Sequence, residues 1–414
     1  MTYVKNLRCV ECGREYKIDP IYVCEFCFGP LEVTYDYDRI KKDLTKQKIE
    51  SRSHNMWRYR ELLPIDGEPA AGFDTGFTPL MNARNLAQAW GVKEIYLKDD
   101  SVNHPTLSFK DRVVAVAITK AKEFGFDTVA CASTGNLANS VAAQSARAGM
   151  KRFIFTPSDL ELSKTITSLI YQPNLVMVDG TYDEVNRLCS EVASKYHWAF
   201  VNINIRPFYG EGSKSLGFEV AEQLGWKTPH NIVVPNASGS LMTKIWKSFK
   251  ELEMLGLVPP VKTRVFAAQA SGCNPIITAI REESDIVKPV KPRTIAKSLA
   301  IGNPADGYYA AKVTRDTGGY GADSSDQEIV DAIKLLAETE GVFAETAGGV
   351  TISAAKKLVE SGRISREETL VICITGNGLK TTEAVVDHLQ RPVPIKPNIE
   401  SFEGLMKQLK REVH

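Results

Sequence analysis

The chain has 414 residues, of which 43% are hydrophobic and 24% are charged, as in a soluble globular protein. Its formal net charge of +1 comes from 51 lysines and arginines against 50 aspartates and glutamates, which argues against binding to nucleic acid or to an anionic membrane surface. No stretch approaches the roughly 20 apolar residues of a membrane span, and the first residues, MTYVKNLRCV, lack the apolar core of a secretory signal. We therefore expect a cytoplasmic protein of two or three domains.

The first predicted unit is a small cysteine-rich module at residues 1–36. Two Cys-x-x-Cys pairs occur in it, followed by LEVTYDYD, which alternates like a β-strand. Two such pairs can present four thiolates to one tetrahedral ion, and a module this short has too small a core to fold without such help. The alternatives are a site that no longer binds metal and disulfides that form on handling. We expect a structural Zn²⁺ ion at Cys9, Cys12, Cys24 and Cys27.

From about residue 93 onward, short β-rich runs alternate with longer helical ones. The predicted strands are residues 94–98, 127–132, 152–156, 174–178, 199–203, 231–235, 264–269 and 370–374. The predicted helices are residues 110–124, 136–148, 181–195, 213–225, 240–255, 326–340 and 350–361. This alternation implies parallel sheets covered by crossover helices, in two α/β units rather than one. Active sites in such folds lie beyond the carboxyl ends of strands.

Three turns of small residues each follow a predicted strand directly and precede a helix. They are CASTGNLANS at 131–140, PNASGS at 235–240 and TGNG at 375–378. None matches a dinucleotide-binding or P-loop motif. A strand, a small-residue turn and a helix nevertheless gather free N–H groups that can bind phosphate, and PNASGS is the strongest case. The alternative is that each turn only begins a helix.

Lys110, in the segment HPTLSFKDR at 104–112, is either a solvated lysine at a helix start or a buried amine held for chemistry. It follows Phe109 and precedes the apolar run VVAVAITKA, so its helix should be buried. A lysine in such surroundings suits a Schiff base with an aldehyde. With phosphate-binding turns nearby, pyridoxal phosphate is the natural partner. Motifs of metallohydrolases and serine hydrolases are missing from the sequence.

The order of these motifs resembles the fold-type II pyridoxal-phosphate enzymes, and within them it is most similar to the threonine synthases. The resemblance runs over nearly the whole chain. The cysteine-rich front end is similar to that of a zinc-ribbon-bearing bacterial subset. The matching segments are GFTPL, SVNHPTLSFKDRVV, ACASTGNLANSVAA, EGSKSLGFEVAEQLGW, AQASGCNP, TIAKSLAIGNPADG, AETAGGVT and ITGNGLKT.

The resemblance implies a role for each matching residue. Lys110 falls on the Schiff-base lysine, Asn136 on the asparagine that binds the ring hydroxyl, and Thr375 on the partner of the pyridine nitrogen. The phosphate loop falls on Asn236, Ala237, Ser238, Gly239 and Ser240. Substrate contacts fall on Ser133 and Thr134 for the carboxylate, and on Asn202 and Arg206 for the phosphate. The loop is poorer in glycine than in many relatives, and His104 lengthens the usual "NPT" spacing.

The resemblance also implies an architecture and a reaction. It implies two three-layer α/β/α domains behind the module, a large one at 37–108 and 209–414 and a small one at 109–208, in a homodimer. It implies a lyase that converts O-phospho-L-homoserine and water to L-threonine and phosphate, the last step of threonine biosynthesis. Alternatives are a related lyase, such as cysteate synthase or serine/threonine ammonia-lyase, and a non-catalytic regulatory or binding protein on the same fold.

Overall fold

A computed structural model describes residues 2–133, 135–158, 162–180 and 182–412 of the chain. The chain divides into two units, Met1–Thr381 and Thr382–His414. The first unit carries three sheets: a three-stranded one near the N-terminus, a six-stranded one and a four-stranded one. The predicted domain boundaries at residues 36, 108 and 208 stay predictions, and residues 382–414, which were placed with the large domain, form the separate second unit.

The six-stranded sheet is parallel except at one edge, where β4 runs antiparallel to β5. Its strands in spatial order are β12 (Gly321–Ser324), β11 (Arg264–Ala270), β10 (Asn231–Pro235), β13 (Thr369–Ile374), β5 (Glu94–Asp99) and β4 (Leu80–Asn82). The central strand β10 is buried along its whole length, because helices cover both faces of a parallel sheet. The sequence did not predict β12 or β4, since both are short and lack a hydrophobic run.

The four-stranded sheet is parallel throughout. Its order is β8 (Asn174–Val178), β7 (Lys151–Pro157), β6 (Thr128–Ala132) and β9 (Ala199–Phe200). β9 is shorter than the predicted strand, because the side chain of Asn204 turns back and accepts a hydrogen bond from the Phe200 N–H at 2.8 Å. The predicted pair of separate parallel sheets is confirmed.

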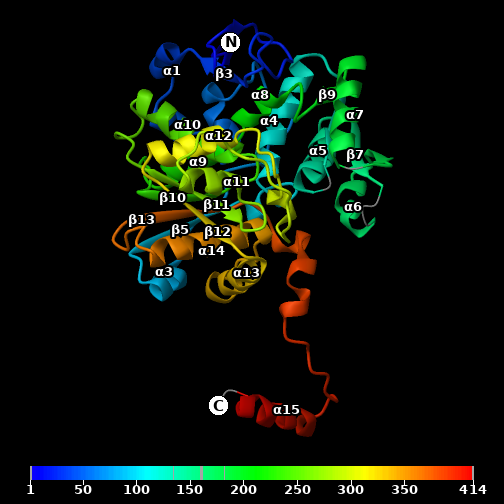
Figure 1. Ribbon diagram of the computed structural model, residues 1–414, viewed down its shortest axis with the longest axis vertical. Helices are drawn as coiled ribbons and strands as arrows, with labels where there is room; N and C mark the ends of the chain where they lie inside the picture. The colour runs from blue at the N-terminus through cyan, green and yellow to red at the C-terminus, as the bar shows by residue number, and fades with distance from the viewer. Residues whose placement is uncertain (1, 134, 159–161, 181, 413–414) are drawn as a thin grey trace. The chain divides into compact units, whose positions relative to one another are not determined.

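Helices cover both faces of the large sheet, as Figure 1 shows. One face carries α3 (Arg84–Trp90), α13 (Asp326–Glu340) and α14 (Thr346–Glu360); the other carries α9 (Lys214–Gln223), α10 (Ser240–Met254), α11 (Pro275–Arg281) and α12 (Gly307–Asp316). The small sheet is accompanied by α4 (Lys110–Glu123), α5 (Asn136–Arg147), α6 (Leu162–Leu169), α7 (Tyr182–Lys195) and α8 (Arg206–Glu211). The three-layer arrangement predicted from the sequence is therefore confirmed.

Helix α14 begins at Thr346, four residues before the predicted start at residue 350. Gly348 and Gly349, which precede the predicted start, lie inside the helix. A Cβ at Gly349 would lie 2.6 Å from the Ile329 carbonyl oxygen of α13. Gly349 therefore permits close packing of α14 on α13 without ending the helix, which is the physical reason for the difference.

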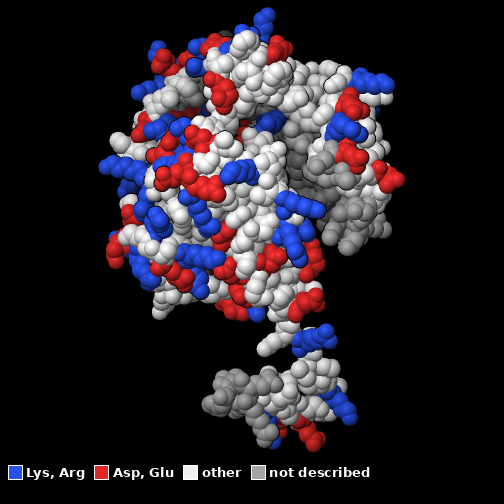
Figure 2. Space-filling model, in the orientation of Figure 1, with Lys and Arg blue, Asp and Glu red and all other residues white. Residues whose placement is uncertain are grey.

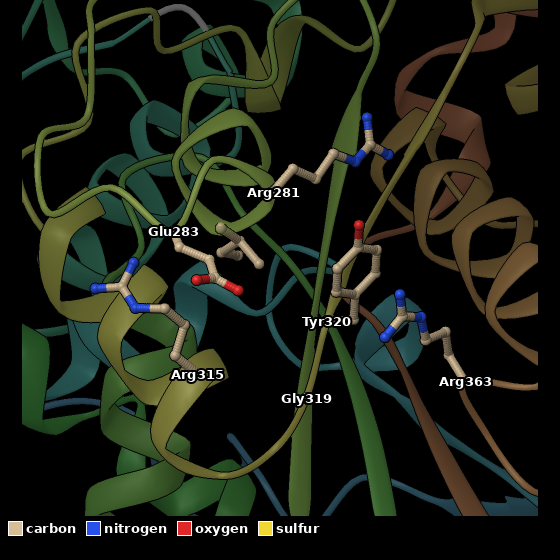
Figure 3. A pocket seen from close by; sticks show the side chains of 7 residues that line it. Arg281, Glu283, Arg315, Gly319, Tyr320 and Arg363 are labelled. Carbon is tan, nitrogen blue, oxygen red and sulfur yellow. The ribbon is translucent and has the colours of Figure 1, made fainter.

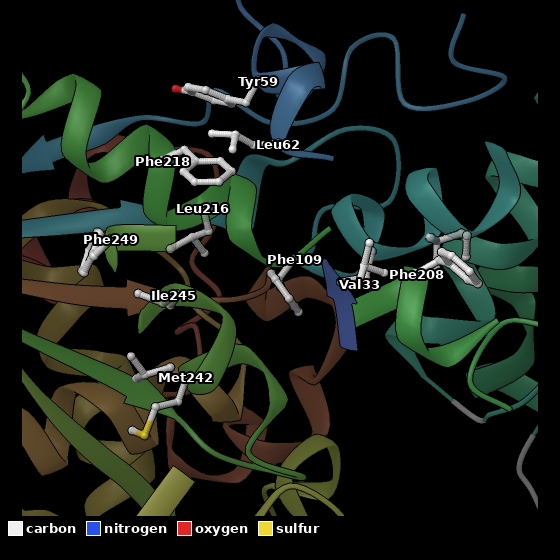
Figure 4. Close-up of a cluster of buried hydrophobic side chains, with 14 of the residues drawn as sticks. Val33, Tyr59, Leu62, Phe109, Phe208, Leu216, Phe218, Met242, Ile245 and Phe249 are labelled. Carbon is white, nitrogen blue, oxygen red and sulfur yellow. The ribbon is translucent and has the colours of Figure 1, made fainter. Parts of the chain in front are cut away.

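The cysteine-rich module shares its core with the rest of the first unit. It consists of β1 (Val4–Cys9), β2 (Glu15–Tyr16) and β3 (Leu31–Tyr35) in an antiparallel sheet, followed by α1 (Tyr37–Asp43) and α2 (Lys46–Glu50). Val33 of β3 belongs to the same buried cluster as Phe109, Phe208 and Met242, part of which is drawn in Figure 4. Since a short module has too little core of its own, this shared burial supports its fold.

A buried ionic network supports the start of α4. Arg112 is fully buried and donates to Asp100 Oδ2 at 2.7 Å and to Glu219 Oε2 at 2.8 Å. Asp111, also fully buried, accepts from the Thr106 N–H at 2.9 Å and from Ser140 Oγ at 2.7 Å. Because the two residues that follow Lys110 are both buried and hydrogen-bonded, the position of the lysine backbone is tightly constrained.

The second unit, residues 382–414, ends in the helix α15 (Ile399–Glu412). Apolar side chains along it are exposed, namely Ile399, Phe402, Met406 and Leu409.

Among the described residues, no helix combines the length and the apolar character that a membrane crossing requires. On the face drawn in Figure 2, acidic and basic side chains are interspersed, in line with the net charge of +1.

Candidate active site

The predicted cofactor residues all follow the carboxyl ends of parallel strands. Lys110 follows β5, Asn236 follows β10 and Thr375 follows β13 in the large sheet, while Asn136 follows β6 in the small sheet. Parallel strands place their carboxyl ends at one edge of a sheet. Residues from distant parts of the chain can therefore meet there.

Lys110 is the first residue of α4 and is half-buried. The backbone N–H of the preceding Phe109 donates to the Thr375 carbonyl at 2.9 Å, so the lysine and the threonine turn are held together. The Lys110 Nζ atom donates to the hydroxyl of Tyr209 at 3.1 Å. It also lies 5.6 Å from the centre of the Phe109 ring. The structure thus places the amine between two aromatic rings rather than in open solvent.

Asn136, the first residue of α5, is held on both sides of its amide. Its Nδ2 donates to Glu345 Oε2 at 2.8 Å, and its Oδ1 accepts from Lys380 Nζ at 3.0 Å. These two contacts determine which way the amide faces, with its donor toward Glu345. The side-chain N–H of Asn136 and the hydroxyl of Thr375 therefore both face the Glu345 carboxylate.

Glu345 is a carboxylate of the site that the sequence analysis did not single out. It is 3% exposed and directly precedes α14. Its other oxygen accepts from Thr375 Oγ1 at 3.5 Å, and its side chain lies on Gly376, where a Cβ would come within 2.5 Å of the carboxyl carbon. Burial raises the pKa of Glu345, while the Asn136 hydrogen bond and the charges of Lys380 and Lys110 act in the opposite direction.

The predicted phosphate loop connects β10 to α10. Gly239 has a φ of +96°, and a Cβ there would lie 2.6 Å from the Asp306 carbonyl oxygen, so a larger residue is disfavoured. Among the described residues, no group accepts from the backbone N–H groups of residues 237–240. These free donors at the positive end of a helix of 15 residues fit a phosphate group. The Asn236 side-chain oxygen is buried there without a hydrogen-bond partner among the described residues.

The predicted substrate residues lie in two places. Arg206 begins α8, and its guanidinium pairs with Asp306 Oδ1 at 2.9 Å. Asn202 has a buried side-chain oxygen without a partner among the described residues. Ser133 accepts from the Gly135 N–H at 3.3 Å, and Thr134 lies outside the described residues. Because Tyr209 also belongs to α8, that helix links Arg206 to Lys110.

Three further residues join the site: Tyr209, Glu345 and Lys380. They stand in the segments RPFYGEGSK, AETAGGVT and ITGNGLKT. The first segment begins at Arg206, and the other two are among the matching segments. A buried carboxylate or a half-buried lysine is recognisable only when its neighbours are known, so the sequence carried no separate signal for their contacts.

His104 extends the loop before Lys110 and plays no visible part in the site. Its side chain is exposed. Its backbone carbonyl accepts from the Thr75 hydroxyl at 2.7 Å. His104 therefore contacts Thr75 through its backbone and not through its imidazole.

A cavity at the opposite end of the large sheet does not belong to this site. It is lined by Ile280, Arg281, Glu283, Arg315, Gly319, Tyr320 and Arg363 (Figure 3). Gly319 and Tyr320 precede β12, at the amino end of the strands. Arg281 and Arg315 are paired with Asp323 and Asp285 at 2.7 and 2.6 Å. None of the predicted site residues lines it.

The four cysteines of the module lie together. Their sulfur atoms are all within 4.8 Å of one another, with Cys9 and Cys27 at 3.4 Å and Cys12 and Cys24 at 3.6 Å. Four thiolates at about 2.3 Å from a tetrahedral zinc ion would lie roughly 3.8 Å apart, so this arrangement fits such an ion. Although burial acts to raise it, hydrogen bonds from Tyr16 and from backbone N–H groups lower the pKa of Cys24 to about 6. Against a hydrogen bond from the Gly29 N–H, the neighbouring thiols raise the pKa of Cys27 to about 12. A thiolate is the form that binds metal.

Comparison with known proteins matches most of the chain to one enzyme family. A family model described as pyridoxal-phosphate dependent enzyme matches residues 73–376, and one described as NinF protein matches residues 8–32. A threonine synthase of Methanocaldococcus jannaschii is 38% identical over 406 residues, which cover 97% of this chain and 99% of that protein. A threonine synthase of Halalkalibacterium halodurans is 34% identical, covering 84% of this chain and 96% of that protein.

Solved structures support the fold. The threonine deaminase isoform 2 of Solanum lycopersicum has a TM-score of 0.63 at 22% identity, covering 74% of this chain and 82% of that one. The diaminopropionate ammonia lyase of Escherichia coli has a TM-score of 0.63 at 19% identity, covering 75% and 88%. At these identities the likeness concerns the fold, whereas the sequence matches extend over nearly the whole chain. The chain therefore belongs to the pyridoxal-phosphate-dependent enzymes, and within them to the family of threonine synthases.

Proposed function

We propose that the enzyme acts on O-phospho-L-homoserine and water and releases L-threonine and phosphate. The observation that carries this proposal is the convergence of Lys110, Asn136 and Thr375, from three distant segments, around the buried Glu345 carboxylate. The similarity to threonine synthases over 97% of the chain supports the choice of substrate.

The site residues fit pyridoxal phosphate, and each has a proposed task. Lys110 would hold the cofactor covalently, Asn136 would donate to its ring hydroxyl and Thr375 would face its pyridine nitrogen. The free N–H groups of residues 237–240 would bind its phosphate. Bound pyridoxal phosphate supplies an electron sink for negative charge that develops at the substrate Cα.

Lys110 is the proposed base and acid of the reaction. With substrate bound in the site, the free amine of Lys110 would take the Cα proton and return protons to the product. The hydroxyl of Tyr209, 3.1 Å from Nζ, keeps that amine in place between proton transfers. Removal of protons from Cα and Cβ would expel the γ-phosphate, and protonation of Cγ, addition of the water hydroxyl to Cβ and return of a proton to Cα would complete threonine.

Arg206, Asn202, Ser133 and Thr134 are the proposed substrate contacts. Arg206 carries the charge that suits a phosphate, and its pairing with Asp306 orients the guanidinium. Asn202, whose side-chain oxygen has no partner among the described residues, would meet the same phosphate. Ser133 and Thr134 follow β6 and would meet the substrate carboxylate.

A phosphate-release assay tests the proposed reaction. Purified enzyme with pyridoxal phosphate should release phosphate from O-phospho-L-homoserine, with threonine identified as the product. Phosphoserine with sulfite, and serine or threonine alone, are the matched substrates of the related lyases. Turnover of one of these instead of phosphohomoserine would contradict the proposal. Protein that stays colourless with added cofactor would favour a binding protein on this fold.

We also propose that Cys9, Cys12, Cys24 and Cys27 hold one structural Zn²⁺ ion. The distances between their sulfur atoms support this. All four ligands come from the protein, which leaves no open position for catalysis. Metal analysis of the purified chain should find about one zinc per chain, and less than about half would contradict the site.

The remaining proposals concern assembly and location. We propose a cytoplasmic homodimer, with the small domain at 109–208 inserted between the two parts of the large domain at 37–108 and 209–414. The separate four-stranded sheet, formed from strands between residues 128 and 200, supports the small domain. Light scattering at several protein concentrations tests the dimer, since a monomer mass throughout would contradict it.

A further inference from the structure

The start of α12 contacts both proposed phosphate sites. The Asp306 N–H donates to the Ser238 carbonyl at 2.9 Å, inside the loop proposed to bind the cofactor phosphate. The Asp306 carboxylate accepts a hydrogen bond of 2.9 Å from Arg206. Arg206 is the residue that is proposed to bind the substrate phosphate. Gly239 lies directly against the Asp306 carbonyl. One residue at one helix start therefore positions two groups that would bind phosphate.

The next turn of the same helix reaches the cysteine-rich module. The Tyr309 hydroxyl donates to the carboxylate of Glu11, which lies between Cys9 and Cys12. The Glu11 side chain in turn packs on Gly29, where a Cβ would lie 2.8 Å from its Cγ. Burial and the Glu11 contact raise the pKa of Tyr309, so the hydroxyl keeps its proton and remains a donor.

A second contact joins the module to α10, the helix that begins at the proposed phosphate loop. Lys244 donates to Glu32 at 2.6 Å and to the buried Glu211 at 2.8 Å. Lys247 donates to the Val33 carbonyl at 2.9 Å. Glu32 and Val33 belong to β3 of the module. Both helices that flank the loop are therefore held from the module side.

We propose that the metal-loaded module braces the proposed phosphate loop, with Tyr309 and Asp306 as positioning residues. The idea rests on the proposed function, because it takes the loop at 236–240 as the cofactor-phosphate site. An ion at the four cysteines orders the turn between Cys9 and Cys12, which carries Glu11. Glu11 holds Tyr309, α12 holds Asp306, and Asp306 holds the loop in a conformation with free N–H groups. A loop that is already ordered binds phosphate without the entropy cost of ordering the loop during binding.

The test compares the affinities for pyridoxal phosphate and for pyridoxal, which lacks the phosphate. Both are measured on the full chain by visible absorbance at equilibrium, with zinc content determined in parallel. Tyr309→Phe should weaken pyridoxal phosphate binding about 5- to 10-fold, in the range of typical coupling between sites. Pyridoxal binding should change less than about twofold. Tyr308→Phe, which removes the hydroxyl of the neighbouring exposed tyrosine, should change neither.

Zinc removal from the wild-type chain should reproduce the effect of Tyr309→Phe. In the Tyr309→Phe variant, zinc removal should add little, because both changes act on the same connection and their effects do not add. Equal losses for the two ligands would overturn the proposal, since they would reflect general destabilisation. An unchanged affinity for pyridoxal phosphate in Tyr309→Phe would overturn it as well.

A loop variant separates this proposal from the proposed function. Ser240→Glu places a negative charge at the start of α10, where it favours the helix but repels phosphate. It should weaken pyridoxal phosphate more than pyridoxal. If it weakens neither, the phosphate-loop assignment fails and the brace fails with it. If it weakens pyridoxal phosphate while Tyr309→Phe does not, the loop stands and only the brace is wrong.

Discussion

Asn136 donates a hydrogen bond of 2.8 Å to the buried carboxylate of Glu345. The two residues lie 209 positions apart in the chain, one at the start of α5 and the other directly before α14. The amide oxygen of Asn136 accepts from Lys380 at 3.0 Å, so the amide cannot flip without losing both contacts. This pair joins the small sheet to the large one at the point where the cofactor ring is proposed to bind.

Replacing Asn136 separates its role as a donor from the effect of charge. Asn136→Ala removes one hydrogen bond to the ring and should weaken pyridoxal phosphate binding roughly 10-fold. Asn136→Asp puts a second carboxylate next to Glu345 and should weaken binding further at neutral pH, with partial recovery on acidification, when the two carboxyls share a proton. Absorbance titrations at several pH values measure this. Equal, pH-independent losses in both variants would contradict the role of Glu345.

Lys110→Ala should abolish covalent cofactor attachment. The variant should lose the visible absorbance of the bound cofactor and at least about 10³-fold in kcat, since it lacks both the covalent anchor and the proposed base. Lys120→Ala serves as a control, because this lysine of the same helix pairs with Glu123 at 2.8 Å. Full turnover in Lys110→Ala would show that another residue carries the chemistry.

Tyr209→Phe tests the contact that positions the Lys110 amine. The ring and its packing are kept, and only the hydroxyl at 3.1 Å from Nζ is removed. We expect kcat to fall roughly 3- to 10-fold, the range of one hydrogen bond, while KM and the visible absorbance change little. A rise in KM with kcat unchanged would instead assign Tyr209 to substrate binding.

Arg206→Ala should raise KM for O-phospho-L-homoserine by roughly 10- to 100-fold, because a charge-assisted contact to phosphate is lost. The affinity for pyridoxal phosphate should stay within about twofold, since the Asp306 N–H contact to Ser238 is a backbone bond that does not need the arginine. Steady-state kinetics and cofactor titration measure the two quantities. A large loss of cofactor affinity with KM unchanged would contradict the assignment.

The buried ionic network around Arg112 predicts a loss of stability in acid. Although burial acts to raise it, the charges of Arg112 and Lys98 lower the pKa of Glu219 to about 2, from 4.5. A depressed carboxyl pKa contributes stability that is present above pH 4.5 and lost as the pH falls toward 2, here by about 3 kcal/mol. Denaturant unfolding at a series of pH values measures the free energy.

Glu219→Gln provides the matched comparison for this pH effect. It leaves Arg112 and Lys98 without the charge of their shared partner, so it should destabilise the protein at pH 7 by about 3 to 5 kcal/mol. Its free energy of unfolding should depend less on pH between 4.5 and 2 than that of the wild type. Glu338→Gln, at an exposed position of α13, should behave as the wild type does. The same pH slope in Glu219→Gln would locate the acid sensitivity elsewhere.

Much of the fold could be predicted from local patterns. Residues 231–235 and 326–340 were predicted as a strand and a helix, and the structure has β10 and α13 at those positions. Both carry strong local signals: an unbroken apolar run in β10, and a capping box at Ser325 in α13. β12, with the sequence GADS, was missed, because it is a strand only through its pairing with β11.

The sequence by itself determined the chemistry that the chain can perform. It marked Lys110, Asn136, Thr375 and the four cysteines, because residue type, spacing and motif order are local properties. Only the tertiary structure decided what surrounds them. The contacts of Glu345 with Asn136, of Tyr209 with Lys110 and of Tyr309 with Glu11 join residues 209, 99 and 298 positions apart. Burial and proximity across such distances depend on how the sheets and helices pack, which no local pattern contains.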